Sequence, residues 1–195
     1  MNKLDTRGGI DLIETDHIIL RKASFADCDL FAEWESRETV IEHFCTTGKR
    51  NLDTITDEFH NVIHDPSREW MTIVEKSSKK PLGKIDITNI DPINDSLNIA
   101  IIYLADEAAR GKGYGTESME ALLRHAFEEL GTHRVTVSHF PDDKVASNLY
   151  TKLGFRTEGI LKLAGKRSNE YFDMELRAIL VEEWDEQNEM KALKA

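Results

Sequence analysis

Hydrophobic residues follow two different spacings along this chain of 195 residues, and each change of spacing marks the end of a predicted element. Apolar residues at intervals of three and four indicate helices, whereas alternation or short apolar runs indicate strands. The helical patterns fall near residues 24–34, 39–44, 53–63, 119–130 and 141–153, with an acidic helix around Trp184. The strand patterns fall at residues 17–21, 70–75, 82–90, 97–104, 134–139, 155–161 and 171–177. The chain is therefore predicted to be an α/β protein.

The order of these elements predicts a mixed sheet with helices on both faces. One strand and three helices come first, then three meandering strands, then a helix, a strand, a helix and two strands. Meandering strands pair antiparallel and helical crossovers pair strands parallel, so we expect an α/β (α+β) fold with a mostly antiparallel sheet of about seven strands. No repeat or linker interrupts the pattern, which predicts one domain over residues 1–195 with its core at about 16–184. Residues up to about Asp11 are expected to form a loose lead-in.

Composition narrows the class of protein. Apolar residues make up 40% and charged residues 31% of the chain, which is typical of a globular protein. The net charge of −11 argues against a nucleic-acid surface and would suit a cationic substrate. Cys28 and Cys45 lack metal-site spacing and are too few for a disulfide framework. Short apolar runs and an N-terminus without a signal-peptide core favour a cytoplasmic protein with no metal and no membrane partner.

A glycine-rich segment joins the apolar strand at 97–104 to the long helix. It reads Arg110-Gly111-Lys112-Gly113-Tyr114-Gly115-Thr116-Glu117. Alternating glycines let the backbone approach a ligand, and their N–H groups, with the helix N-terminus, favour an anion such as phosphate. The spacing matches neither the dinucleotide fingerprint nor the nucleoside-triphosphate loop. From the glycines alone, a pyrophosphate site and a plain tight turn are equally good interpretations.

Two motifs in order resemble the GCN5-related N-acetyltransferase family. Arg110-x-x-Gly113-x-Gly115 resembles the acyl-CoA loop of that family, [Q/R]-x-x-G-x-[G/A], and lies after the fourth predicted strand as it does there. Residues 149–155, Leu-Tyr-Thr-Lys-Leu-Gly-Phe, resemble the second signature of the family. One glycine loop is weak evidence, whereas two signatures in matching structural context are specific.

The resemblance extends over most of the chain. Residues 20–27, which begin Leu-Arg and end Ala-Asp, resemble the usual opening of the family, so the match spans about residues 16–184. The length and the N-terminal helices are most similar to the ribosomal-protein acetyltransferases of the RimJ/RimL type. Bacterial spermidine acetyltransferases share the same layout. The fold implied is the acetyltransferase sheet, in which strands four and five splay apart to admit the cofactor.

This resemblance implies an acetyl-CoA-dependent N-acetyltransferase. Its cosubstrate would be acetyl-CoA (coenzyme A), and its acceptor a primary amine, either a small molecule or a peptide or protein N-terminus. A spermidine or polyamine acetyltransferase is the second hypothesis, and a non-catalytic acyl-CoA-binding sensor is the third. The resemblance implies no nucleic-acid partner, and a homodimer is compatible with it.

The resemblance also implies which residues contact the cofactor. The loop would hold the pyrophosphate through its backbone N–H groups, and the end of the fourth strand would hold the pantetheine arm. An asparagine usually lies seven residues before the signature tyrosine; here Asp143 replaces it, and Asn148 would supply part of that contact. The longer loop lets the strand register shift to Ile101. The expected cofactor-binding residues are Ile102, Tyr103, Leu104, Arg110, Gly111, Lys112, Gly113, Tyr114, Gly115, Asp143 and Asn148.

Two residues are the candidates for proton transfer. By resemblance, Tyr150 would donate a proton to the leaving thiolate, a role for which a phenol with a pKa of about 10 is protonated at neutral pH. Asn98 stands where many relatives carry a glutamate base and cannot serve. Asp86, on the polar face of the neighbouring strand, is the candidate base. His139, Glu75 and a water relay remain alternatives.

Acceptor choice is expected in the N-terminal helices and in a loop at residues 162–171, because recognition varies in loops that a rigid scaffold positions. One hypothesis places an acidic and aromatic surface for a cation on residues of the first two helices, which are Trp34, Glu35, Glu38, Glu42 and His43. The same residues also fit helices with one buried and one solvated face, and we favour that interpretation.

Overall fold

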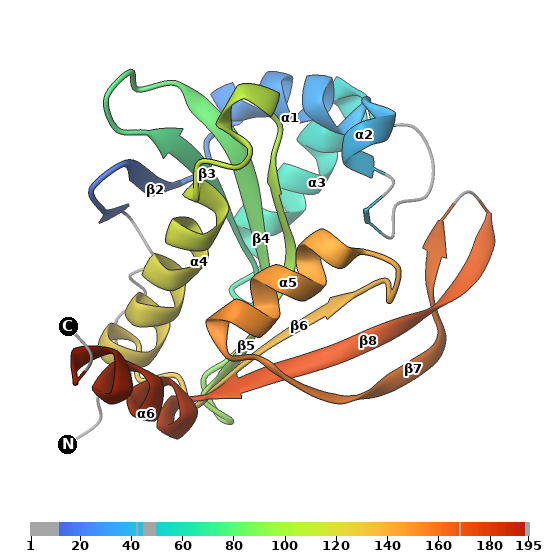
Figure 1. Ribbon diagram of the computed structural model, residues 1–195. Helices are drawn as coiled ribbons and strands as arrows, with labels where there is room; N and C mark the ends of the chain where they lie inside the picture. Colours follow the sequence, from blue (N-terminus) through green and yellow to red (C-terminus); the bar gives the residue numbers. More distant parts are fainter. Residues whose placement is uncertain (1–11, 42, 45–49, 168, 194–195) are drawn as a thin grey trace.

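The computed structural model describes residues 12–41, 43–44, 50–167 and 169–193, and within them eight strands form one sheet (Figure 1). The sheet order is β1-β2-β3-β4-β5-β6-β8-β7. Only β5 and β6 pair parallel, because the α4 crossover joins them; the other neighbours are antiparallel. The strands are β1 Leu12–Glu14, β2 Ile18–Lys22, β3 Glu69–Glu75, β4 Pro81–Asp91, β5 Ser96–Leu104, β6 Arg134–His139, β7 Arg156–Arg167 and β8 Glu170–Leu180.

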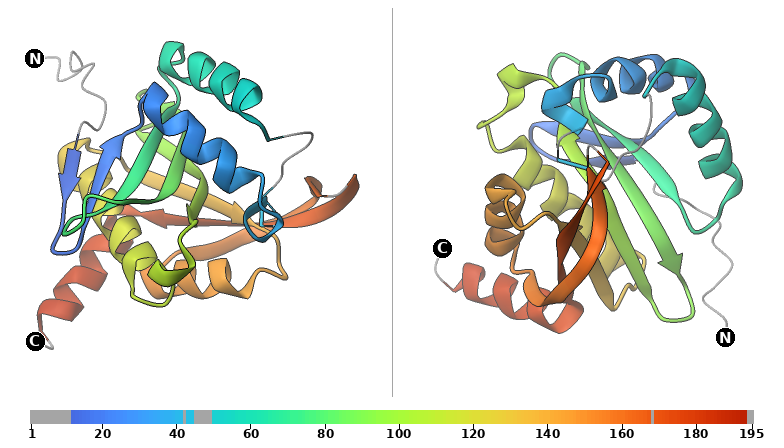
Figure 2. Two further views of the ribbon diagram at one scale, coloured as in Figure 1. Left: turned by 90° about the horizontal axis from the view of Figure 1, so that it is seen from above. Right: turned by 90° about the vertical axis from the view of Figure 1, so that its right-hand side faces the viewer.

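Helices cover both faces of this sheet, as Figure 2 shows. One group precedes β3 in the chain and the other group follows β5. They are α1 Cys28–Glu35, α2 Glu38–Ile41, α3 Leu52–His64, α4 Tyr114–Arg124, α5 Lys144–Leu153 and α6 Val181–Ala192. A π-helical turn, His125–Glu129, continues α4. No helix in the described ranges is long and apolar enough to cross a bilayer.

The two helical layers bury two separate hydrophobic clusters. On one face, Met119 and Leu122 of α4, Leu153 of α5 and Trp184 of α6 pack over the inner residues of β2 to β6 and β8. On the other face, helices α1, α2 and α3 surround Trp70. The alternation predicted for β4 is confirmed, since its isoleucines face the first cluster while its Lys84 side chain lies over the Trp70 ring. One sheet thus supports both cores.

The predicted architecture is confirmed, with differences at three elements. The sheet has one strand more than the expected seven, because β1 lies before the predicted core. The second helix ends at Ile41 rather than Phe44. The prediction that residues 162–171 form a loop is wrong: β7 continues to Arg167 and β8 begins at Glu170, so the two strands form a long hairpin. Register shifts between Leu161 and Gly165 interrupt the pairing of β7 with β8, so the sequence in this region lacks the regular alternation that predicts a strand.

Candidate active site

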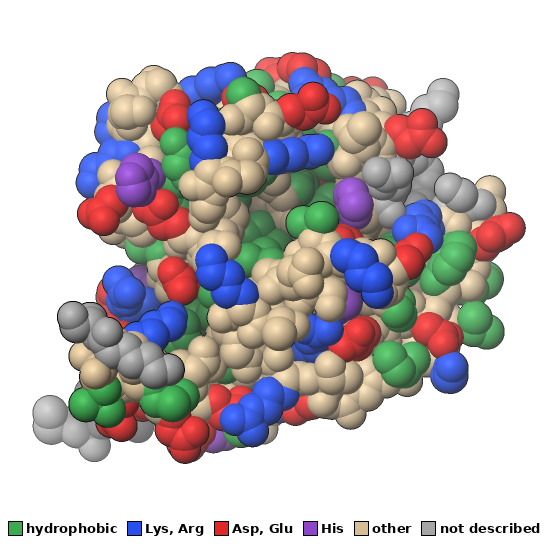
Figure 3. Space-filling view, in the orientation of Figure 1, with side chains coloured by type: hydrophobic (Ala, Val, Ile, Leu, Met, Phe, Trp, Pro, Cys, Tyr) green, Lys and Arg blue, Asp and Glu red, His purple; other side chains and the backbone are tan. Residues whose placement is uncertain are grey.

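β5 and β6 lie side by side over only the first half of β5. Their parallel register runs from Ser96 and Arg134 to Ile99 and Val137. Beyond it, β5 stays paired with β4 as far as Leu104, while β6 stays paired with β8. The expected splay of the fourth and fifth predicted strands is confirmed at β5 and β6. Figure 3 shows the surface hollowed between α4 and α5, with hydrophobic side chains inside the hollow.

A β-bulge in β5 lies where the splay begins. Ile101 pairs with Asp86 and Ile99 pairs with Ile87, so Ala100 has no partner on β4. The extra residue changes which face the following side chains occupy. After it, Ile102 packs against the α4–α6 cluster, whereas Ile101 packs against the α1–α3 cluster.

The glycine loop has the backbone shape of an anion site. Gly111 and Gly113 have φ values of 75° and 87°, a region that residues with a Cβ rarely adopt. Gly113 is the N-cap of α4, and a Cβ at Gly111 or Gly113 would meet no atom within 4 Å. Gly115 lies inside the first turn of α4. N–H groups are therefore presented at the positive end of an 11-residue helix.

The side chains of the loop have distinct surroundings. Arg110 folds back, and its Nε donates to the Leu104 carbonyl at 3.2 Å. The Tyr114 hydroxyl donates to Glu75 at 3.0 Å. Lys112 is exposed, with its Nζ 5.9 Å from the Tyr114 ring centroid. Lys112 is therefore the loop cation best placed to reach a ligand in solvent.

The end of β5 is held against β4 by a glycine that sequence reasoning missed. A Cβ on Gly83 would lie 1.9 Å from the Tyr103 carbonyl oxygen, so only glycine fits there. The Tyr103 side chain turns away from α4, and its hydroxyl donates to Glu35 at 3.0 Å. Burial, and next the charge of Glu35, raise the pKa of Tyr103. Tyr103 can therefore offer a cofactor only its backbone.

Tyr150 lies buried on α5, with its ring 5.6 Å from each of the His139 and Phe155 rings. No residue in the described ranges makes a hydrogen bond to its hydroxyl. Burial, and to a smaller extent the charge of Asp143, raise the pKa of Tyr150. The phenol is therefore held protonated, as a proton donor requires.

Arg177 of β8 fixes α5 on the sheet and was missed by the sequence analysis. Its guanidinium donates to the Ser147 carbonyl at 3.1 Å, to the Ser147 hydroxyl at 2.9 Å and to the Thr151 hydroxyl at 2.8 Å. Gly154, with φ of 91°, ends the helix. These contacts fix the helix that carries Tyr150.

Asp143 is the N-cap of α5. Its Oδ1 accepts from the Ala146 N–H at 2.9 Å, and its Oδ2 lies 2.9 Å from Nδ1 of His43. Both carboxylate oxygens are therefore already bonded within the protein. Asn148 is exposed on the same helix.

The candidate bases lie in different environments. Asp86 is buried on β4 beside Arg68, whose Nη2 donates to it at 3.0 Å. Burial raises the pKa of Asp86, and Arg68 offsets part of that rise. Hydrogen bonds from Ser78 and then Tyr114 lower the pKa of Glu75, which weakens it as a base. His139 is buried, with Nδ1 2.8 Å from the Phe140 carbonyl.

The acidic and aromatic surface proposed on the first helices is not formed by Trp34 or Glu35, because both are buried. Glu35 accepts from Lys84 Nζ at 2.9 Å and from Arg50 Nε at 3.0 Å. Burial alone would raise the pKa of Glu35, but Lys84 and Arg50 together lower it. Glu38 is exposed, and Glu42 lies outside the described residues. The favoured interpretation, one buried and one solvated face, is confirmed for Trp34 and Glu38.

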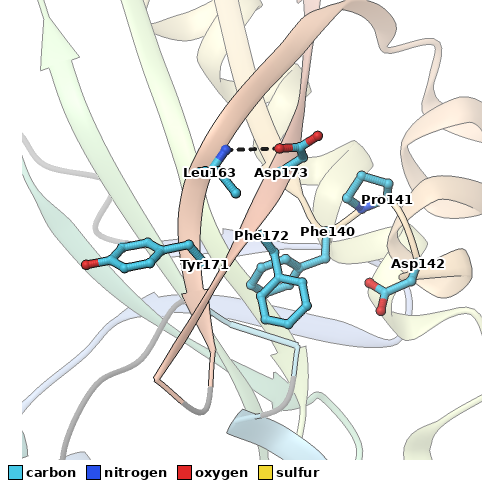
Figure 4. A pocket seen from close by; sticks show the side chains of 7 residues that line it. All are labelled: Phe140, Pro141, Asp142, Leu163, Tyr171, Phe172 and Asp173. Carbon is cyan, nitrogen blue, oxygen red and sulfur yellow. Dashed lines mark hydrogen bonds between the residues drawn. The ribbon is translucent and has the colours of Figure 1, made fainter.

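A cavity of about 410 Å³ lies between the β7–β8 hairpin and the turn from β6 to α5 (Figure 4). Its carboxylates already have cationic partners: Arg167 donates to Asp142 at 3.0 Å, and Lys162 donates to Asp173 at 2.6 Å. What remains is mostly aromatic and apolar surface. The lining residues are Phe140, Pro141, Asp142, Leu163, Tyr171, Phe172 and Asp173. No cluster suited to a metal ion occurs among the residues that the structure describes.

Separated strands beside a glycine loop at a helix N-terminus define an acyltransferase of the acetyltransferase fold class. Residues 17–156 match the model of the acetyltransferase (GNAT) domain, and the chain belongs to this family of enzymes. It is 23% identical to an uncharacterized N-acetyltransferase, p20, of Bacillus licheniformis, over 90% of this chain and 99% of that protein.

Two similar proteins with named acceptors differ in the kind of acceptor. The chain is 22% identical to the [ribosomal protein uS5]-alanine N-acetyltransferase of Escherichia coli, over 88% of this chain and 92% of that protein. The structure is similar to spermidine N-acetyltransferase from Vibrio cholerae in complex with CoA and spermine, with a TM-score of 0.79 and 19% identity over 87% of this chain and 99% of that one. At this identity, the similarity to the spermidine N-acetyltransferase structure is evidence for the fold and not for the acceptor.

Proposed function

We propose that this protein transfers the acetyl group of acetyl-CoA to the N-terminal amine of a peptide or protein. The observation that carries the proposal is the splay of β5 from β6 beyond Ile99, next to the left-handed glycines at the start of α4. A thioester cosubstrate with a pyrophosphate fits this arrangement, because the splay leaves strand edges for its arm and the loop offers N–H groups to its phosphates.

Each part of the site has a proposed role in this reaction. The backbone of residues 110–115 and the Lys112 side chain bind the pyrophosphate, and the backbone of residues 102–104 orients the thioester. Because Leu104 already accepts from Arg110, Ile102 is the best placed of the three. Tyr150 donates the proton that the departing sulfur gains. Asp86 is a candidate base whose raised pKa suits proton acceptance but whose pairing with Arg68 opposes it.

Three carboxylates, one beside Tyr103 and two in the hairpin cavity, favour a peptide acceptor over a polyamine. A polyamine carries several positive charges and needs carboxylates without cationic partners. Here Glu35 is bound by Lys84 and Arg50, and the two carboxylates of the hairpin cavity are bound by Lys162 and Arg167. The aromatic lining of that cavity suits the first side chains of a peptide. Spermidine remains the second candidate acceptor, since relatives of both kinds are similar to this chain.

A thiol-release assay with acetyl-CoA tests the proposal. The acceptors are short peptides that begin with alanine or serine, the same peptides already acetylated at the N-terminus, and spermidine. We expect thiol release with the free peptides and none with their acetylated controls. Release with spermidine alone would favour the polyamine hypothesis. Acetyl-CoA binding without turnover would favour the sensor hypothesis, and failure to bind acetyl-CoA would contradict all three.

A further inference from the structure

The contact between His43 and Asp143 joins the segment after α2 to the start of α5. The Nδ1 of His43 lies 2.9 Å from Oδ2 of Asp143, although the residues are 100 positions apart. The carboxylate side chain is 10% exposed and the imidazole is 43% exposed. The Asp143 carboxylate is therefore nearly buried and fixed by its capping hydrogen bond, while the His43 imidazole reaches solvent.

This geometry selects one tautomer of the imidazole. A carboxylate accepts hydrogen bonds, so Nδ1 carries the hydrogen that is donated to Asp143. In the neutral ring, Nε2 is then the nitrogen with the basic lone pair. A histidine oriented through Nδ1 by a carboxylate is the arrangement that prepares a general base in many enzymes.

The dyad, meaning His43 and Asp143, adjoins the two parts of the proposed site. Tyr150 follows Asp143 by seven residues, which is roughly 10 Å along α5. Helical side chains lean toward the helix N-terminus, so the Tyr150 ring leans toward Asp143. The charge of Asp143 acts on Tyr150, in agreement with this placement. On the other side, Asp142 lines the aromatic cavity proposed for the acceptor (Figure 4).

We propose that His43, held by Asp143, is the general base that deprotonates the acceptor amine. This inference rests on the proposed function, and it assigns to Asp143 a positioning role in place of a cofactor contact. The ammonium group of the acceptor gives one proton to Nε2 of His43, which releases it to solvent. The amine nitrogen then bonds to the acetyl carbon while the carbon–sulfur bond breaks. Sulfur gains a proton from Tyr150, and the second proton lost by nitrogen returns to Tyr150.

Other charged groups lie around the dyad. Asp142 interacts with the charge of His43 and is itself paired with Arg167 of β7. Lys144 begins α5, with its Nζ 3.5 Å from the Pro141 carbonyl. The carboxylate of Asp86 is bound by an arginine, and no such cation binds the Asp143 carboxylate within the described ranges. The dyad is thus the better prepared base of the two.

The test compares four variants of the full chain with alanine- and serine-initiated peptides as acceptors. His43→Ala removes the base. Asp143→Asn keeps the α5 cap but lets an amide donate to Nδ1, which would leave the proton on Nε2. Asp86→Asn tests the competing base. His133→Gln is the matched control, because His133 lies just before the start of β6, beside Glu182, whereas α5 follows the other end of that strand.

We expect kcat to fall about 100-fold in His43→Ala and in Asp143→Asn, which is the lower range for loss of a general base. In both variants the KM for acetyl-CoA should stay within about twofold of the wild-type value. Asp86→Asn should keep most of the wild-type activity. Added imidazole should restore part of the activity of His43→Ala. Wild-type kcat in His43→Ala, or a loss that imidazole does not restore, would overturn the proposal.

Asp143→Asn distinguishes positioning from cofactor contact. If residue 143 acts on the cofactor, the variant should change the KM for acetyl-CoA while keeping kcat, and this result would also overturn the proposal. Nitrogen-detected NMR of the histidines gives a measurement that needs no turnover. We expect neutral His43 as the Nδ1–H tautomer in wild type; the Nε2–H tautomer would contradict the dyad. An inactive wild-type protein that shows the expected tautomer would instead locate the failure in the proposed function.

Discussion

At the scale of single residues, Tyr150 combines burial with a hydroxyl that no residue in the described ranges bonds. Burial disfavours the phenolate, and the nearby charge of Asp143 adds to this effect, so the pKa of Tyr150 is raised. A group with a raised pKa keeps its proton to higher pH than a free phenol, which titrates near pH 10. Tyr150 should therefore remain a proton donor throughout the neutral and mildly alkaline range.

Tyr150→Phe tests this role while preserving the ring and its packing. We expect kcat to fall about 100-fold, since only the donor is lost, with acetyl-CoA affinity unchanged. Wild-type kcat should not decline through deprotonation of Tyr150 below about pH 9.5, because a raised pKa moves that decline upward. Steady-state kinetics against pH, with thermal unfolding as the folding control, provide the measurement. Unchanged kcat in Tyr150→Phe would remove the general-acid role.

Single residues also show where sequence reasoning reached its limit. Tyr150 could be located because it belongs to a contiguous signature. Glu35 could not be placed, because its partners Lys84 and Tyr103 are 49 and 68 residues away. The contact of His43 with Asp143 likewise depends on the tertiary fold. Local patterns carry no information about such pairs, so surface and core roles of charged residues were the least predictable part of the site.

At the scale of elements, most helices and strands followed from hydrophobic periodicity, and the loop–helix unit at residues 110–124 followed from its glycines. Irregularities in strand pairing could not be predicted from the sequence. Ala100 adds one residue to β5, and the shifts between Leu161 and Gly165 disturb the hairpin. A period-two pattern is lost wherever a bulge intervenes, so the sequence could predict these strands but not their faces or full lengths.

Two glycines with similar backbone shape allow a matched test of the loop. Gly113 and Gly131 have φ values of 87° and 70°, and a Cβ at either meets no atom within 4 Å. Gly113→Glu and Gly131→Glu should therefore each lose about 1–2 kcal/mol of stability through backbone strain. Only Gly113→Glu should lose acetyl-CoA binding, because it places negative charge at the proposed pyrophosphate site. Calorimetric titration measures this, and binding retained by Gly113→Glu would contradict the pyrophosphate assignment.

At the scale of the whole molecule, both hydrophobic clusters depend on the same sheet. Trp34 and Trp70 belong to the cluster under α1–α3, whereas Trp184 belongs to the cluster under α4–α6. Neither helical layer has a second surface on which to bury its apolar side. The two layers should therefore unfold together, as expected of one domain.

Urea unfolding of Trp184→Phe tests this cooperativity. Its fluorescence reports only the α1–α3 side, whereas far-UV circular dichroism reports all helices and strands. We expect a single transition with coincident midpoints by the two probes. Two separated transitions would show that the layers are independent domains.

The bulge at Ala100 makes the end of β5 more sensitive to a change of length than to a change of side chain. Removing this one residue would advance Ile101 to Leu104 by a single position and exchange their two faces. Tyr103 would then point toward α4, and Ile102 and Leu104 would point toward Lys84 and Glu35. A deletion that leaves every remaining residue intact would thus bring a phenol into the proposed acetyl-transfer cleft and place aliphatic chains against a buried ion pair.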